Sequence, residues 1–93
     1  MEITYNDHNR LITFVSVHQA IFAERVLKEG QVKTIAMPTP REIDLSCGHC
    51  LLFKESNEQQ LLDILDKNKV IWSKIFERIM PERRYVLIGQ YGG

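Results

Sequence analysis

The order of structural elements is set near the start of the chain by the stretch LITFVSVHQ, residues 11–19. Its first five residues are mostly apolar and rich in β-branched side chains, which is typical of a buried strand. The spacing from Ser16 to Gln19 is that of a capping box, in which a hydroxyl and an amide side chain bond the first free N–H groups of a helix. Apolar residues then recur at helical spacing. The stretch therefore predicts a strand over 11–15 followed directly by a helix over 17–29.

The same signals recur further along the chain. Gly30 is a typical end for the first helix, and Pro38 and Pro40 end the strand that follows, because proline cannot donate to a strand ladder. Ser56 and Gln59 repeat the capping-box spacing ahead of a second apolar stripe at helical spacing. The remaining predicted elements are strands over 32–37, 51–53 and 70–79, and a helix from 57 to about 68.

This β-α-β-β-α-β order predicts an α+β fold, the ferredoxin-like sandwich, in which an antiparallel sheet carries two helices on one face. A β-grasp fold is the main alternative, but it would begin with a hairpin and contain one principal helix. The chain divides into a polar leader (1–9), a single domain (10–79) and a tail (80–93). An apolar run in the tail could form a further strand.

Composition narrows the class of protein. The 93 residues carry 12 basic and 12 acidic side chains, so the charge pattern favours neither nucleic acid nor an anionic membrane as a partner. The apolar content of 44 % is that of a globular protein. Two cysteines do not make a disulfide scaffold. Without an export signal or a bilayer-spanning run in the sequence, a cytoplasmic protein with reduced thiols is expected.

The loop between the second and third predicted strands is the best candidate for chemistry, since functional residues often lie on loops held by a rigid scaffold. Cys47 is its strongest nucleophile, and the cations Arg41 and His49 lie close enough in sequence to favour a thiolate. Gly48 would allow close approach of a ligand to the backbone or a positive φ. The structural alternative is that Cys47 is a small buried residue in a tight turn.

From Leu11 to about Phe76 the chain resembles the small family of selenium/sulfur (Se/S) carrier-like proteins. The matching residues are Glu24, LKEG at 27–30, PxPREI at 38–43, SCG at 46–48 and Phe53. The resemblance implies that Cys47 holds a persulfide or selenopersulfide, with Arg41, Ser46, Gly48 and His49 around it. It implies a carrier or accessory protein rather than a stand-alone enzyme, with a protein donor or acceptor as partner and no cofactor.

Cys50 departs from the family pattern, where an apolar residue is expected. It completes the string CGHC over 47–50, the dithiol sequence of protein disulfide isomerases, and could act as a resolving thiol. In those proteins the motif opens a helix, whereas a strand follows here. Extended residues 47 and 50 would lie about 10 Å apart, and a disulfide needs less than about 7 Å. No metal site is expected, because the cysteines and His49 supply at most three local ligands.

A second function stays open beside the carrier. The chain could be a non-enzymatic module that binds a protein or a small ligand and whose cysteines are structural. The tail run at residues 85–88 (Tyr-Val-Leu-Ile) could then add a strand to a neighbouring molecule. Pairing of two copies of this chain into a homodimer is one form of that interaction.

Overall fold

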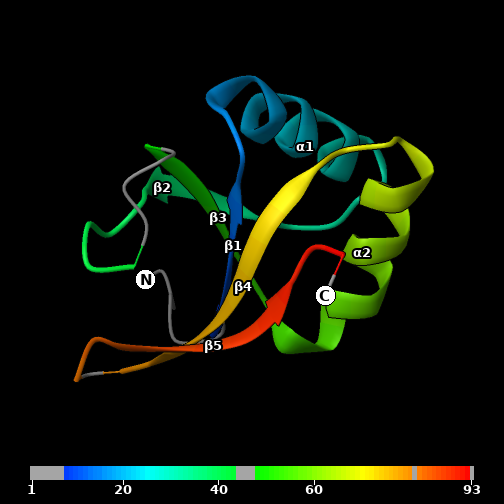
Figure 1. The fold of residues 1–93 in the computed structure, drawn as a ribbon. Helices are drawn as coiled ribbons and strands as arrows, with labels where there is room; N and C mark the ends of the chain where they lie inside the picture. Colours follow the sequence, from blue (N-terminus) through cyan, green and yellow to red (C-terminus); the bar gives the residue numbers. More distant parts are fainter. Residues whose placement is uncertain (1–7, 44–47, 81, 93) are drawn as a thin grey trace.

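The computed structural model describes residues 8–43, 48–80 and 82–92. In chain order its elements are β1 (Arg10–Phe14), α1 (Val17–Glu29), β2 (Ile35–Pro38), β3 (His49–Phe53), the short 3-10 helix η2 (Glu55–Asn57), α2 (Glu58–Lys67), β4 (Trp72–Ile79) and β5 (Arg84–Gln90). The fold is α+β, with two helices and a five-stranded antiparallel sheet in the order β2-β3-β1-β4-β5 (Figure 1). The sheet thus has one strand more than the sandwich expected from the sequence, because the tail supplies β5.

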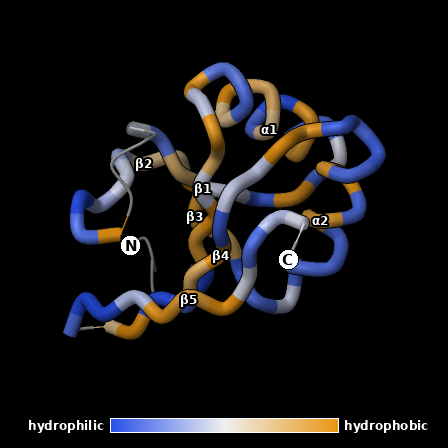
Figure 2. Tube along the Cα trace, viewed as in Figure 1, coloured by the Kyte–Doolittle hydropathy of each residue, from blue (hydrophilic) through white to orange (hydrophobic). Residues whose placement is uncertain are grey.

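The two helices pack on one face of the sheet. Side chains alternate between the faces of a strand, and Ile12 and Phe14 of β1 pack with Leu51 and Phe53 of β3 in the core beneath the helices. The helices contribute to this core Ala20, Ala23, Val26, Leu27, Leu61 and Leu65. Figure 2 shows the hydrophobic character of the central strands β1 and β3. This core is what fixes the sheet beneath α1 and α2.

The opposite face of the sheet is apolar as well. Leu11, Cys50, Leu52 and Phe76 form a second buried cluster there. The partly buried side chains packed against it are Ile35, Met37, Ile43 and Tyr85. The loop after β2 and the β4–β5 hairpin therefore help to cover the face that the helices leave open.

The bounds predicted for α1 are confirmed, and its caps explain them. Ser16 Oγ accepts a hydrogen bond from the backbone N–H of Gln19 at 3.3 Å, whereas the Gln19 side chain accepts from the backbone N–H of Ile71 at 2.9 Å. Gly30 is the C-cap with φ −84°, and the left-handed residue is the next one, Gln31, with φ 64°. A Cβ on Gly30 would lie 2.5 Å from a methyl group of Ile64. Glycine at this position thus allows α1 and α2 to approach closely.

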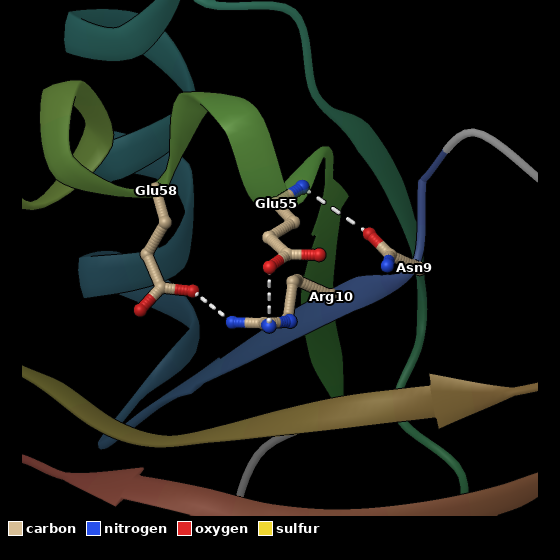
Figure 3. Close-up of polar contacts among 4 residues, drawn as sticks. All are labelled: Asn9, Arg10, Glu55 and Glu58. Atoms are coloured by element: carbon tan, nitrogen blue, oxygen red, sulfur yellow. Dashed lines mark hydrogen bonds and ion pairs between the residues drawn. The ribbon is translucent and has the colours of Figure 1, made fainter.

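The predicted start of α2 at a capping box is wrong. Ser56 lies in η2, and α2 begins at Glu58 with no side-chain cap. The approach to the helix is held instead by the first residue of β1 and the residue before it. Asn9 Oδ1 accepts from the backbone N–H of Glu55 at 3.2 Å, and the Arg10 guanidinium pairs with Glu55 and Glu58 at 3.3 and 2.5 Å (Figure 3). These long-range contacts replace the local cap.

Strand β2 is shorter than predicted. It begins at Ile35, because Val32 belongs to the turn that closes α1 and donates its backbone N–H to Leu27 O at 2.9 Å. Pro38 is its last residue and pairs with His49 of β3. Among the described residues, no helix has the length and apolar content needed to cross a bilayer.

Candidate functional site

The loop between β2 and β3 is held at both of its described ends by Thr39 and Pro40. Ile43 donates its backbone N–H to Pro40 O at 3.2 Å, and Thr39 donates its own to Gly48 O at 3.2 Å. Ser46 and Cys47, two of the residues predicted to form the site, lie outside the described residues. Gly48 follows Cys47 directly in the chain, so the segment that carries the predicted thiol ends beside Thr39.

This loop is open to solvent at Arg41, Glu42 and Gly48, whereas Thr39 is buried. Gly48 is exposed, and a Cβ at this position would meet no atom of another described residue within 4 Å. Crowding by the described residues therefore does not require glycine here. Arg41 is exposed in the turn after β2 and forms no ion pair with another described residue.

Cys50 and His49 belong to β3 and diverge from each other. Cys50 is fully buried in the second apolar cluster, with its Sγ 4.0 Å from Pro38 O. His49 is the neighbouring residue of the strand, so its side chain projects to the opposite face. Cys50 thus occupies the apolar position of the family pattern as a small core residue. A buried thiol is shielded from solvent reagents, and a resolving role for Cys50 stays a prediction.

A hollow of about 390 Å³ lies on the sheet face away from the helices, between the end of β2 and the β4–β5 hairpin. We call it the sheet-face pocket. Its lining residues are Met37, Pro38, Thr39, Pro40, Glu42, Arg78, Met80, Arg83 and Tyr85. A smaller hollow of about 180 Å³ adjoins it and shares Met37 and Arg78. The pocket thus brings the loop that leads to Cys47 next to the arginines of the hairpin.

The described lining of the sheet-face pocket includes two arginines and one glutamate. Arg78 is held by its backbone N–H, which donates to Asn9 O at 2.8 Å, and by Nη1, which donates to His8 O at 3.4 Å. Neither Arg78 nor Arg83 forms an ion pair within the described part of the chain. Thr39 is about nine-tenths buried, and its hydroxyl has no hydrogen-bond partner in that part either. The site is therefore positively charged and has a buried hydroxyl without a partner.

Sequence reasoning missed Thr39, Arg78 and Arg83 as site residues. They lie up to 44 positions apart in the chain, and the sheet brings them together across its open face. The pair Arg83-Arg84 was a visible signal, but it is too short to indicate nucleic acid and it says nothing of a pocket. No group of three or more metal-ligating side chains occurs in ranges 8–43, 48–80 and 82–92.

A larger hollow, of about 540 Å³, lies between the end of α1 and the start of β2. Its lining includes Glu24, Lys28 and Lys33, which are side chains of both charges, and no described residue of the loop from 39 to 48. We place the candidate site in the smaller sheet-face pocket, because that pocket adjoins the loop that carries Cys47.

Comparison with known proteins assigns the chain to a family. No curated protein and no solved structure matches it. The sequence pattern of the family described as "Putative Se/S carrier protein-like" matches residues 9–77, about three quarters of the chain. This range contains β1 to most of β4 and the whole loop from Pro38 to Gly48. The chain belongs to this family of Se/S carrier-like proteins.

Proposed function

We propose that the protein is a small sulfur or selenium carrier that holds a persulfide or selenopersulfide on Cys47. The observation that carries the proposal is the family match, which spans Cys47 and the loop around it. Two features of the structure support it. The described ends of the loop are exposed at Arg41 and Gly48, and the second thiol, Cys50, is buried in the core. Cys47 is therefore the better candidate of the two for transfer between proteins.

The transfer needs no cofactor. The thiolate of Cys47 attacks the outer sulfur of a persulfide R–S–SH on a donor protein. The S–S bond of the donor breaks, a new S–S bond forms on Cys47, and the donor leaves as the thiolate R–S⁻. Electrons and atoms balance without an added oxidant, and the reverse reaction unloads the carrier to an acceptor thiol. In this proposal Arg41 favours the thiolate, and Ser46, Gly48 and His49 surround it.

Intact-mass spectrometry after incubation with a low-molecular-weight persulfide tests the proposal. We expect an adduct of one sulfur atom on the wild-type chain and on Cys50→Ala, and none on Cys47→Ser. Alanine is the matched control at position 50 because that side chain is buried and apolar in its contacts. An adduct that persists in Cys47→Ser, or no adduct on the wild type, would overturn the carrier proposal.

The finer fold and the location belong to the same proposal. We propose that β1 to β4 with the two helices form a ferredoxin-like sandwich, extended by β5. The strand order β2-β3-β1-β4 and the two helices on one face support this. We place the carrier in the cytoplasm, where a thiol that must exchange sulfur stays reduced.

A second candidate function, pairing of two copies through β5, is favoured by a separate observation. β5 is an edge strand, and its consecutive residues Val86, Leu87 and Ile88 are 42–48 % exposed. A bulge relative to β4 lies near Ile88. Lysine and proline, which commonly protect an edge strand against pairing with another chain, do not occur between Tyr85 and Gly89. The oligomeric state of a Leu87→Lys variant, measured by light scattering, tests this proposal.

A further inference from the structure

We propose that the sheet-face pocket binds a small oxyanion through Arg78 and Arg83, with Thr39 in its wall. The proposal uses only lining residues from the described part of the chain and gives no role to Cys47. The proposal therefore stands whether or not Cys47 carries sulfur.

The charges of the pocket favour an anion. Guanidinium groups offer a planar fork of N–H donors that matches two oxygens of an oxyanion. Two arginines line the pocket against one acidic residue, Glu42, among its described lining residues, in a chain whose formal net charge is zero. Neither arginine has an ion-pair partner among residues 8–43, 48–80 and 82–92. The local positive charge is thus left for a ligand to compensate.

The position of Arg78 is fixed before any ligand arrives. Its backbone N–H and its Nη1 both bond the segment ahead of β1, at Asn9 O and His8 O, while its other guanidinium nitrogens remain for a ligand. Arg83 closes the hairpin directly before Arg84, which pairs with Ile79. The Arg78 guanidinium is already held by a hydrogen bond, whereas the Arg83 side chain is exposed, so binding must order it at an entropic cost.

Thr39 supplies the second observation. Thr39 lines the pocket and is about nine-tenths buried, and its hydroxyl lacks a hydrogen-bond partner in the described part of the chain. A buried hydroxyl without a partner is unfavourable, because it has lost its hydrogen bonds to water and has formed no hydrogen bond within the protein. An oxygen of a bound ligand is a suitable partner once a change of the Thr39 rotamer turns the hydroxyl toward the pocket.

The rest of the lining limits the class of ligand. Met37, Pro40 and Met80 give the pocket an apolar wall beside the arginines. The shared chemistry of the ligand is an oxyanion group, either free, as in sulfate and thiosulfate, or at the end of a small organic molecule, as in a sulfonate.

Titration with sodium sulfate, sodium thiosulfate and sodium methanesulfonate at constant ionic strength tests the proposal. The readout is the chemical shift of the backbone amides of Thr39, Arg78 and Arg83. We expect saturable shifts at these amides, and the salt with the tightest binding identifies the source of the oxyanion group. Loss of one guanidinium, in Arg78→Gln or Arg83→Gln, is expected to weaken binding about tenfold, because each removes a charge-assisted contact.

Two further variants make the test specific. Arg84→Gln is the matched control, since it removes the same charge one position further along, outside the pocket lining, and is expected to bind like the wild type. Thr39→Val keeps the buried shape, removes the hydroxyl and should weaken binding by a few-fold without loss of the fold. Absence of a saturable shift in the wild type, or equal weakening in Arg84→Gln and Arg83→Gln, overturns the proposal. The persulfide assay has a different readout, so the two proposals fail separately.

Discussion

Arg10 links the sheet to the second helix. Its side chain is 15 % exposed and pairs with Glu58 at the start of α2 and with Glu55 in η2 (Figure 3). Arg10→Gln should lower the free energy of unfolding by about 1–2 kcal/mol, because it breaks charge-assisted contacts in a partly buried site. Chemical denaturation followed by circular dichroism measures this change.

Glu55→Gln is the matched control for Arg10. The Glu55 side chain is 63 % exposed, and exposed ion pairs contribute little to stability. We expect its substitution to cost less than about 0.5 kcal/mol. Equal losses in Glu55→Gln and Arg10→Gln would contradict the assignment of Arg10 as the link between β1 and α2.

At the scale of single residues, sequence reasoning worked where one residue type has one strong local preference. Ser16 was predicted as a helix cap and is one. Cys50 looked like half of a dithiol, but its surroundings are those of a core residue, because burial depends on which strands lie on either side. Arg78 carried no local signal at all, since its role in the pocket depends on residues near position 39.

The C-terminal ends of both helices contain a residue that is not suited to its backbone. Gln31 after α1 and Lys69 after α2 have φ of 64° and 58°, a left-handed conformation that glycine adopts at lower cost. Gln31→Gly should raise the free energy of unfolding by about 0.5–1 kcal/mol, whereas Gln31→Ala should not raise it. Thermal unfolding measures both; a gain for alanine equal to that for glycine would rule out the left-handed backbone as the cause.

At the scale of elements, helix α1 could be predicted to the residue because its cap and its apolar spacing are both local. The start of α2 could not, because Asn9 and Arg10, more than 40 positions away, hold η2 in the place where a capping box was expected. Strand β2 was predicted too long for a related reason. Val32 is used to complete the end of α1, a contact that an alternating pattern does not reveal.

At the scale of the whole molecule, the element order was enough to predict an α+β chain with two helices. It was not enough to predict the covered second face of the sheet. That face depends on how the loop after β2 and the β4–β5 hairpin lie over Leu11 and Phe76, which is a matter of sheet order and curvature. The sheet-face pocket is a consequence of the same arrangement.

Pairing of two copies through β5 makes a prediction for the whole molecule. An antiparallel pairing centred on Leu87 would set Val86 opposite Ile88 of the second copy and Arg84 opposite Gln90, so that apolar residues meet and no like charges do. We expect light scattering to find a dimer of the wild-type chain and a monomer of Leu87→Lys, because a lysine would oppose itself at the centre.

Ile21→Lys, at an exposed apolar residue of α1, should remain a dimer. Truncation at Ile79 is a poorer test, since it would also remove the contact of Tyr91 with Trp72. A monomeric wild type, or dissociation by Ile21→Lys as well, would show that β5 does not join two copies.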